Sequence, residues 1–322
     1  MNAEGAELRT TLREELDGRL RRSPLDFIRE MDPFGDRAKW LDELTRPIPP
    51  GHDLTFASDV QEVGRTAVFA EVLPWDTEFF GFTVARLNAI IPIADPTYQV
   101  LADLGGSVDA LIETCRARGV RYLFAPVDMR DAAVARALTS RGFELIESRL
   151  YAHRSLVGFA PGERFGVRLA TEEDVEPLSN VAVSMVNPYD RFHADPVLFG
   201  EKADRLMGEW VRASVCDGFA DGAMVPDVAR PGAFLTIKHH QERWAQWGKA
   251  IGQAPFGAVS PEFRGWYVRL ISEICCYLRD MGAEHFFMVS QATNNAVVRS
   301  WEKLGLHYGK NELILRRLVE CL

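Results

Sequence analysis

A hexapeptide at residues 75–80, WDTEFF, concentrates side chains that could bind an organic ligand. Its three aromatic rings offer faces on which a planar group can stack, and its two carboxylates can accept hydrogen bonds from hydroxyl or amine groups. This combination suits a nucleotide base and a sugar. The alternative is a loop that folds its rings under a sheet and binds nothing. The candidate binding residues here are Trp75, Asp76, Phe79 and Phe80.

Adjacent histidines at positions 239 and 240 raise the question of a metal site. Consecutive residues of a strand project to opposite faces, so this pair does not bind one ion, and we interpret it as the start of a hairpin. The five cysteines fit neither a zinc spacing nor a secreted disulfide framework. We expect no metal, and we expect buried thiols at the apolar Cys275–Cys276 pair. The cysteines are Cys115, Cys216, Cys275, Cys276 and Cys321.

The overall composition of the chain limits the kinds of partner that it can bind. The chain has 322 residues with 47% hydrophobic content, which suits two domains better than one. A formal net charge of −9 argues against non-specific binding of nucleic acid. The N-terminal segment is too charged for a signal peptide, and no apolar run reaches membrane-spanning length. We therefore predict a cytoplasmic protein that binds neither nucleic acid nor a membrane.

The elements that must position these residues change character at Thr66. Before it, two amphipathic helices and a Pro-rich linker form a helical N-terminal extension, which could be an appendage, a dimerisation arm or a cover over the core. After it, the pattern alternates between short apolar runs and helical spacing. The predicted strands are 66–74, 83–93, 121–128 and 144–156, and the predicted helices are 107–120 and 131–143.

The same order recurs further along the chain. Residues 167–185 indicate a strand and a helix, and a fuller α/β unit follows them. Its predicted strands are 249–261, 285–291 and 307–318, and its helices are 266–283 and 294–305. We interpret this as an internal repeat of one α/β unit. The predicted domains are 1–65, 66–160 and 161–322.

Two stretches of the second copy resemble the GCN5-related N-acetyltransferase (GNAT) superfamily: GAVSPEFRGWYVRLI (257–271) and TNNAVVRSWEKLGL (293–306). More narrowly, WDTEFFGF, RFHADP (191–196) and EWVRAS (209–214) are similar to segments of dTDP-fucosamine acetyltransferase and related sugar-nucleotide N-acyltransferases. The resemblance covers roughly residues 66–318. It implies an α/β fold of tandem GNAT-like units, a truncated N-terminal copy and a full C-terminal copy, with mixed central sheets flanked by helices.

In this family, a glycine-rich turn opens a helix whose free N–H groups hold the pyrophosphate of coenzyme A. The usual pattern, Arg/Gln-x-x-Gly-x-Gly/Ala, is altered here. We prefer a two-residue deletion, which makes Gly265 the last glycine of the loop and starts the helix at Trp266. The resemblance implies an acyl-CoA co-substrate, with the oxyanion stabilised by backbone N–H groups near 257–259. The implied contacts are Ala258, Val259, Arg264, Gly265, Trp266, Tyr267, Asn294 and Trp301.

The family often places a tyrosine seven residues after the asparagine, where it protonates the departing thiolate. At that spacing from Asn294 this chain has Trp301, whose indole N–H donates a hydrogen bond but is not a general acid. Tyr308 is a candidate replacement, as is a water held by Asn294. The alternatives are an ordinary strand aromatic for Tyr308 and a helix cap for Asn294.

An amine acceptor must lose a proton before it attacks. The candidate base is His193, oriented by Asp190 and Asp195, and the alternative is a loop histidine that only binds a hydroxyl. The resemblance places further residues on the acceptor side together with the WDTEFF segment. They are Arg191, Phe192, His193 and Trp210.

These observations predict an N-acyltransferase that moves an acyl group, acetyl first, from acyl-CoA to the amine of an amino-sugar nucleotide or a similar small amine. Two alternatives stay open: a different chemistry on the same fold in specialised metabolism, and a non-catalytic protein that binds a ligand or a partner. An enzyme should have a hollow between the two central strands of its C-terminal unit. A binding protein should have it plugged by Trp266 or Trp301. Whether the chain forms a homodimer is also open.

Overall fold

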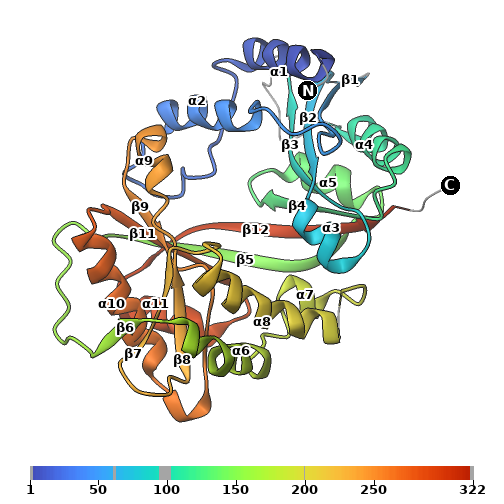
Figure 1. Cartoon of the computed structure of the whole chain (residues 1–322). Helices are drawn as coiled ribbons and strands as arrows, with labels where there is room; N and C mark the ends of the chain where they lie inside the picture. The colour runs from blue at the N-terminus through green and yellow to red at the C-terminus, as the bar shows by residue number, and fades with distance from the viewer. Residues whose placement is uncertain (1–2, 61–62, 94–102, 199, 320–322) are drawn as a thin grey trace. The chain divides into compact units, whose positions relative to one another are not determined.

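The computed structural model describes residues 3–60, 63–93, 103–198 and 200–319, and its chain divides into two compact units (Figure 1). Unit 1 comprises Met1–Ser148 and Asn311–Leu322, and unit 2 comprises Arg149–Lys310. Two long strands, β5 (Glu144–Ser155) and β12 (His307–Leu318), contribute residues to both units. The domain limits inferred from the sequence stay a prediction, because compactness does not define the copies of a repeat. Each unit is described below by itself.

Unit 1 is built on a mixed sheet in the order β1-β2-β3-β4-β12. The pairs β1–β2, β2–β3 and β4–β12 are antiparallel, and the pair β3–β4 is parallel. Its strands are β1 (Phe56–Val60), β2 (Gly64–Val72), β3 (Val84–Pro92) and β4 (Tyr122–Asp128), and its helices beyond residue 70 are α3 (Pro74–Phe80), α4 (Gly105–Ala117) and α5 (Ala132–Thr139). Strand β1 was missed by the sequence analysis, because FASDV has no alternation of apolar and polar residues.

Helices of the N-terminal segment cover one face of this sheet. Alternate residues of β2 face opposite sides: Val68 belongs to the core cluster that includes α4, whereas Phe69 belongs to a separate cluster. That second cluster contains Leu12 and Leu16 of α1 (Ala3–Leu16) and Leu41 of α2 (Pro33–Leu44). Of the three roles left open for this segment, the structure therefore shows a cover over the core.

A buried ion pair holds α1 in this position. The guanidinium of Arg9, 4% exposed, donates to both carboxylate oxygens of Asp53 at 2.8 and 2.7 Å. It also donates to the Leu44 carbonyl and to the Thr55 hydroxyl, both at 2.6 Å. Burial opposes ionisation of Asp53, but the hydrogen bonds from Arg9 and Thr55 outweigh it and hold the pKa of this carboxyl below its ordinary value.

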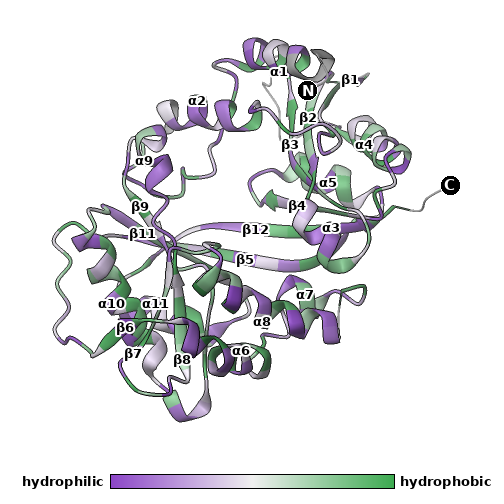
Figure 2. Cartoon of the chain, in the orientation of Figure 1, coloured by the Kyte–Doolittle hydropathy of each residue, from purple (hydrophilic) through white to green (hydrophobic). Residues whose placement is uncertain are grey.

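Unit 2 contains an antiparallel four-stranded sheet in the order β10-β8-β7-β6 and a second strand group, β5-β11-β9. The strands are β6 (Val167–Leu169), β7 (Gly222–Pro226), β8 (Ala233–Ile237), β9 (Ile251–Gln253), β10 (Gly257–Val259) and β11 (His285–Gln291). The helices are α6 (Val175–Ser184), α7 (Arg191–Ala194), α8 (Glu201–Cys216), α9 (Gln241–Trp247), α10 (Trp266–Asp280) and α11 (Asn295–Lys303). Figure 2 shows hydrophobic residues along β8 and mostly hydrophilic ones on α2.

Most elements predicted from the sequence are present, and two interpretations need correction. The strand predicted over 249–261 is two short strands, β9 and β10, which lie in different sheets. The histidines at 239 and 240 do not start a hairpin, because helix α9 begins at Gln241. The predicted α/β class with mixed sheets is confirmed. Within the described residues, no helix is both long and apolar enough to cross a membrane.

Removing the Arg9 side chain tests whether the N-terminal segment stabilises unit 1. Arg9→Ala leaves the carboxylate of Asp53 without its partner, and we expect a loss of about 3 kcal/mol in the free energy of unfolding. Arg13→Ala on the same helix is the matched control, since its ion pair with Asp42 is exposed and should contribute about 0.5 kcal/mol or less. Urea unfolding measures both. Equal effects of the two substitutions would contradict the assigned role of Arg9.

Candidate active site in unit 2

Two neighbouring strands of unit 2 diverge after Gln253. Strand β9 pairs in parallel with β11, with Gln253 opposite Phe287. The chain then passes through Ala254, Pro255 and Phe256, and β10 pairs with β8 rather than with β11. Proline has no N–H for a ladder, and the Phe256 carbonyl accepts a hydrogen bond from the Thr236 amide of β8 at 2.7 Å. We use the word slot for the region between the two strand edges that this change of partner leaves unpaired, one on β10 and one at the end of β11.

The edge of β10 that faces away from β8 carries free backbone donors. The residues before and after β10 are bonded to the β8 side, since Ser260 N–H donates to the Gly232 carbonyl at 2.8 Å. Because backbone N–H groups alternate along a strand, the N–H groups of Gly257 and Val259 point to the opposite edge. No described strand pairs with that edge. The Ala258 N–H faces β8, so Val259 and Gly257 supply the donors of the slot.

The close packing of β10 against β8 explains why position 257 is a glycine. A Cβ there would lie 2.3 Å from the Leu235 side chain and 2.6 Å from the Phe234 carbonyl oxygen. Strand β10 thus approaches β8 more closely than a larger residue permits. This contact keeps β10 against β8 and away from β11.

The N-terminus of α10 forms an anion-binding end. Gly265 precedes the helix with a φ of 94°, a left-handed conformation that L-residues rarely adopt. No side chain of the described residues caps this end, so its first N–H groups are free to bind an anion. Arg264 beside it is exposed and makes no ion pair within the described part of the chain. The helix begins at Trp266, as the deletion in the loop predicts.

Trp301 and Tyr267 lie together in the hydrophobic core of unit 2. Trp301 on α11 is 2% exposed. Tyr267 in the first turn of α10 belongs to the same hydrophobic cluster, as do Val259 and Trp266. Burial raises the pKa of the Tyr267 hydroxyl, and the nearby Trp301 indole, a donor, offsets part of this rise. The Tyr267 hydroxyl therefore stays protonated at neutral pH.

Asn294 caps helix α11, as one alternative predicted. Its Oδ1 accepts a hydrogen bond from the Val297 amide at 3.3 Å, and its Nδ2 lies 3.4 Å from the Ser290 Oγ. Gln291 at the end of β11 accepts a bond from the Asn187 side chain at 2.6 Å. Ser290 and Gln291 were not among the site residues predicted from the sequence. The feature of the sequence that could have identified them is the change from apolar to polar residues at the end of HFFMVSQ.

His193 is held between two carboxylates. Its Nδ1 lies 2.8 Å from Asp190 Oδ2, and its Nε2 lies 3.3 Å from Asp204 Oδ1 on α8. The hydrogen bond to Asp190 raises the pKa of His193, burial opposes the rise, and Asp204 adds to it. A general base needs a free lone pair, and this geometry instead favours an imidazolium that holds α7 and α8 together. The role of His193 as a base stays a prediction.

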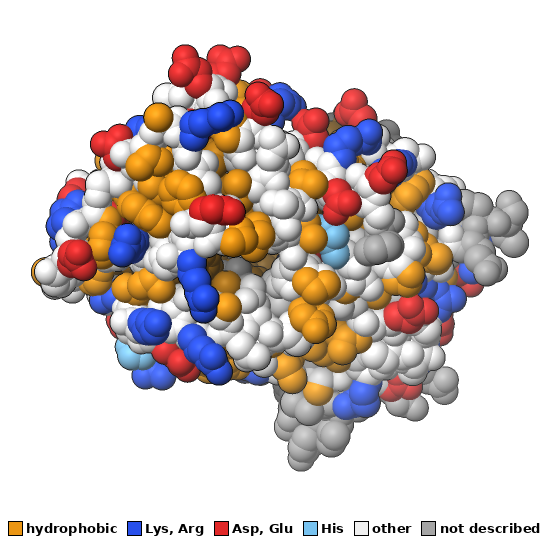
Figure 3. All heavy atoms as spheres, turned by 90° about the horizontal axis from the view of Figure 1, so that it is seen from below, with side chains coloured by type: hydrophobic (Ala, Val, Ile, Leu, Met, Phe, Trp, Pro, Cys, Tyr) orange, Lys and Arg blue, Asp and Glu red, His pale blue; other side chains and the backbone are white. Residues whose placement is uncertain are grey.

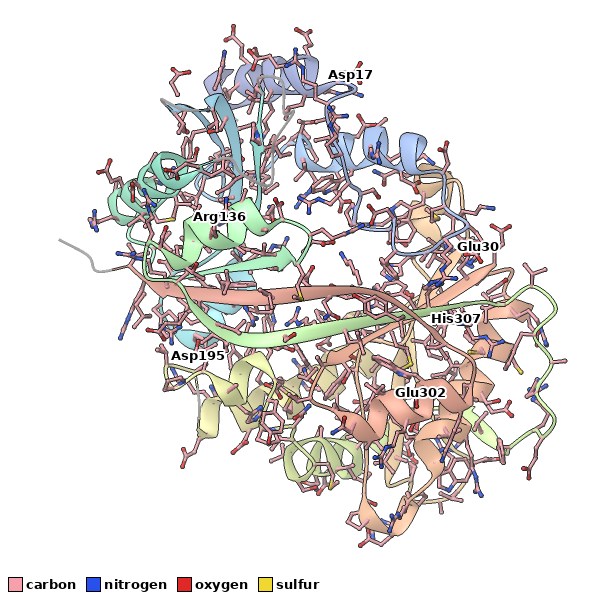
Figure 4. The ribbon with its side chains drawn as sticks, turned by 180° about the vertical axis from the view of Figure 1, so that it is seen from behind. Asp17, Glu30, Arg136, Asp195, Glu302 and His307 are labelled. Atoms are coloured by element: carbon pink, nitrogen blue, oxygen red, sulfur yellow. The ribbon has the colours of Figure 1, made fainter. Side chains whose placement is uncertain are left out.

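The other predicted residues of RFHADP are buried around this histidine. Arg191 is 8% exposed and lies over the Phe192 ring, with its Cζ 4.4 Å from the ring centroid. Asp195, which was expected to orient His193, accepts a hydrogen bond from the Val197 amide at 2.9 Å (Figure 4). Asp204, eleven residues after the histidine, was missed because no local spacing links it to His193.

An aromatic cluster extends from Phe192 through Trp210. The Trp210 ring contacts Phe192 and Phe256 edge-on, each at 5.4 Å between centroids, and stacks on Phe219 at 6.3 Å. Phe219 is 55% exposed, so one end of the cluster faces solvent. Because Phe256 directly precedes β10, the cluster reaches the strand that carries the slot's donors. Figure 3, which views the molecule from below Figure 1, shows a hollow bordered by hydrophobic side chains, with Lys and Arg along one side.

Neither family models nor curated proteins match this chain. Solved structures do. A GCN5-related N-acetyltransferase from Sphaerobacter thermophilus aligns over 100% of this chain and 95% of its own, with a TM-score of 0.59 and 12% identity. A tandem GNAT protein from the clavulanic acid biosynthesis pathway aligns over 100% and 97%, with a TM-score of 0.55 and 14% identity. A glucosamine N-acetyltransferase region of a fungal multi-domain GH3 β-N-acetylglucosaminidase covers 96% of this chain and 37% of its own, with a TM-score of 0.58 and 14% identity.

The chain has the tandem GNAT fold. Such identities show the fold alone, but the matches run the full length of the chain. The tandem GNAT arrangement predicted from the repeat and from the two family motifs is confirmed.

Within the GNAT fold, WDTEFF and RFHADP belong to different units. The segment 74–80 forms helix α3 of unit 1, which ends on Gly81 in a left-handed conformation. Trp75 is 43% exposed and stacks on Phe79 at 5.4 Å, while Phe80 is buried. The Thr77 Oγ1 accepts a hydrogen bond from the Val84 amide at 3.0 Å. Binding by Trp75, Asp76, Phe79 and Phe80 stays a prediction.

Tyr308, proposed as a replacement acid, is 60% exposed at the start of β12, next to His307 (Figure 4). An exposed hydroxyl is poorly suited to protonate a buried thiolate, which favours the ordinary strand aromatic. In the described part of the chain, no three His, Cys, Asp or Glu side chains are grouped to hold a metal. Cys275 and Cys276 are buried as expected, Cys216 is exposed, and Cys321 lies outside the described residues.

The charge on His193 predicts a pH-dependent contribution to stability. Because the pKa is raised in the folded protein, the charged ring stabilises the fold fully below the ordinary pKa of about 6.5, and the contribution is lost as the pH rises through the raised value. We expect His193→Phe to cost about 2 kcal/mol at pH 6 and clearly less at pH 9.

Urea unfolding at the two pH values measures this difference. His307→Gln is the control, since that histidine is exposed and its substitution should have little effect at either pH. A cost of His193→Phe that is the same at pH 6 and pH 9 would show that the ring is neutral in the folded protein.

Proposed function

We propose that this protein is an acyl-CoA-dependent N-acyltransferase, with an acetyl group as the first candidate and a small primary amine as the acceptor. The observation that carries the proposal is the divergence of β10 from β11, which leaves the N–H groups of Gly257 and Val259 unpaired. An acyl-CoA thioester laid along that edge would complete the missing ladder. Its carbonyl oxygen would then face backbone donors as negative charge develops on it.

The N-terminus of α10 also supports acyl-CoA as the donor of the acyl group. Free N–H groups behind Gly265 and the unpaired Arg264 side chain suit the pyrophosphate of coenzyme A. With a net charge of −9, the chain needs such a local group of donors to hold an anionic ligand. Because the loop is short, Trp266 and Tyr267 lie in the first turn of α10, and their backbone N–H groups are available to bind an anion.

The proposed reaction at this site is direct attack of an amine on the thioester. The acceptor nitrogen forms the new C–N bond, the C–S bond breaks with its electron pair on the sulfur of CoA, and the nitrogen loses its proton to water. Holding both reactants in line supplies much of the acceleration, so the reaction does not require the family's tyrosine.

An amino-sugar nucleotide is the first choice of acceptor. The choice rests on the resemblance of RFHADP and the Trp210 helix to sugar-nucleotide N-acyltransferases. The aromatic cluster around Trp210 offers a ring face and the carboxylates near His193 suit a cationic amine. One structural neighbour is described as a glucosamine N-acetyltransferase region. A non-catalytic binding protein is the second candidate, favoured by the burial of Trp301 at the position of the acid.

Calorimetric titration with acetyl-CoA tests the donor site. We expect the wild type to bind, and Gly265→Ala to bind about tenfold more weakly, because an L-residue at φ 94° costs roughly 1–2 kcal/mol and displaces the end of α10. The control Gly158→Ala has a φ of 70° with open space around it. It should lose similar stability and keep full affinity. If the wild type binds no CoA compound, the proposed function is wrong.

Turnover separates the enzyme from the binding protein. Release of the CoA thiol from acetyl-CoA should rise when the correct amine is added, and amino-sugar nucleotides are the first to screen. Binding of acetyl-CoA with no acceptor-dependent release across amino sugars, amino-sugar nucleotides and simple polyamines would favour the second candidate.

A further inference from the structure

His240 has a backbone conformation that its own side chain disfavours. It is the one non-glycine residue with a positive φ, 55°, among the residues that the structure describes. In this left-handed region the Cβ atom crowds the backbone carbonyl, so glycine is the usual choice. Residues held in such conformations gather at functional sites. A histidine kept at a position that suits glycine points to a role of its imidazole ring.

The ring of His240 is fixed at the point where β9 and β11 stop pairing. Its Nε2 lies 3.0 Å from Oε1 of Gln253, the last residue of β9. The ring also stacks on Phe287, the residue of β11 opposite Gln253, with centroids 6.4 Å apart and 14° between the planes. A further contact, at 5.3 Å between centroids, is to Trp247 of α9. Because the slot begins directly after Gln253 and Phe287, His240 lies at its closed end.

This group of side chains lies on the face of the strands that is turned away from α10. A Cβ at Gly252 would lie 2.7 Å from the Leu278 side chain of α10, so the side-chain position of Gly252 faces that helix. Consecutive residues of a strand project to opposite faces. Gln253 therefore faces away from α10, and it holds the His240 ring on that same side.

The aromatic cluster of Trp210 lies on the same face. On β8, Leu235 packs with α10 residues in one hydrophobic cluster, and its neighbour Phe234 projects to the other side. The Phe234 ring contacts Phe256 at 5.3 Å, and Phe256 contacts Trp210 at 5.4 Å. This cluster is the surface that we assign to the acceptor. His240 and the acceptor surface thus share one side of the slot.

The hydrogen bond to Gln253 decides which ring nitrogen of His240 can take up a proton. An amide oxygen only accepts, so Nε2 carries the hydrogen and donates it, and Nδ1 keeps its lone pair. No hydrogen bond to Nδ1 forms within the described part of the chain. His193, in contrast, has a carboxylate at each ring nitrogen. His240 has the free lone pair that a base requires and that His193 lacks.

The surroundings also keep the His240 ring uncharged. Burial lowers its pKa, and the nearby charges of Arg243 and Lys238 add to this effect. The hydrogen bond to Gln253 and the carboxylate of Glu242 oppose it and are outweighed. With a pKa below the ordinary value of about 6.5, the ring is neutral at neutral pH and can act as a base.

We propose that Nδ1 of His240 accepts the proton of the acceptor amine during acyl transfer. This inference rests on the proposed function and places a histidine between the amine and water. As the amine nitrogen bonds to the acyl carbon, its proton passes to Nδ1, and the electron pair of the C–S bond stays on sulfur. The imidazolium then releases the proton to water. Gln253 is a positioning residue, because it holds the ring in the tautomer that this transfer needs.

Bromoacetyl-CoA tests the position of His240 without knowledge of the acceptor. A base that touches the attacking amine lies beside the acyl group, so the bound reagent should alkylate Nδ1, forming an N–C bond as bromide leaves. Mass spectrometry of peptides from the full chain locates the label. Bromoacetamide has the same reactive group without CoA, and at equal concentration it should label His240 at least about tenfold more slowly, because nothing holds it in place.

Two substitutions at neighbouring positions assign the label. His240→Asn keeps a residue that tolerates a positive φ and removes the base, so position 240 should stay unlabelled. His239→Asn is the matched control, because the His239 ring contacts Tyr277 of α10, with centroids 5.6 Å apart, and so lies on the other side. It should leave the labelling of His240 unchanged. In the wild type, labelling should slow as the pH falls through the lowered pKa of His240.

Turnover separates a base from a structural residue. With an amine that supports release of CoA, kcat/KM of the wild type should fall at acidic pH as His240 takes up a proton. His240→Asn should lose about 10²- to 10⁴-fold in kcat/KM at neutral pH and no longer show this acidic fall, while it binds acetyl-CoA like the wild type. His239→Asn should keep the wild-type profile.

The outcomes are distinct. If bromoacetyl-CoA binds and leaves His240 unlabelled, or if bromoacetamide labels His240 equally fast, the ring is not beside the acyl group. The inference then fails while the site for CoA stands. Full turnover with an unchanged pH profile in His240→Asn would also overturn it. If the protein binds no CoA compound, the proposed function fails and this inference falls with it.

Discussion

The pairing of β10 with β8 instead of β11 is the constraint on which the site depends. A strand has two edges, and β10 bonds through one of them, so the donors of the other edge stay available. Pro255 interrupts the ladder and Gly257 permits the close approach to β8, which together make the divergence local and fixed. The helices α10 and α11 follow β10 and β11 in the chain, so their first turns start near the slot. The anion-binding end at Gly265 lies at the start of one of these helices, α10.

Unit 1 is also built from helices packed on a sheet. Its sheet is covered on both faces, by α4 on one and by α1 and α2 on the other, and the Arg9–Asp53 pair fixes the second cover. A sheet packed on both faces is buried and gives the long strands β5 and β12 a stable frame. In this account, helices α1 and α2 complete the core of unit 1.

The sequence predicts most elements because their apolar spacing is regular, and the motifs around Gly265 and Asn294 place the candidate site at the start of two helices. It does not predict the break after Gln253, because Ala-Pro-Phe is an apolar segment that continues the strand pattern and only the partner strand decides its direction. It also misses Asp204 as the second carboxylate at His193, since that contact comes from the packing of α7 against α8. A contact between segments that are far apart in the sequence leaves no pattern among the residues next to either of them.

The most direct test of the central claim is amide hydrogen exchange at Gly257 and Val259, measured with and without acetyl-CoA. These two N–H groups face the unpaired edge of β10, whereas the Ala258 N–H is directed to β8. The account predicts that saturating acetyl-CoA slows exchange at Gly257 and Val259 and leaves Ala258 unchanged. Unchanged exchange at both residues while acetyl-CoA is bound would show that the ligand lies elsewhere, and would contradict the role assigned to the slot.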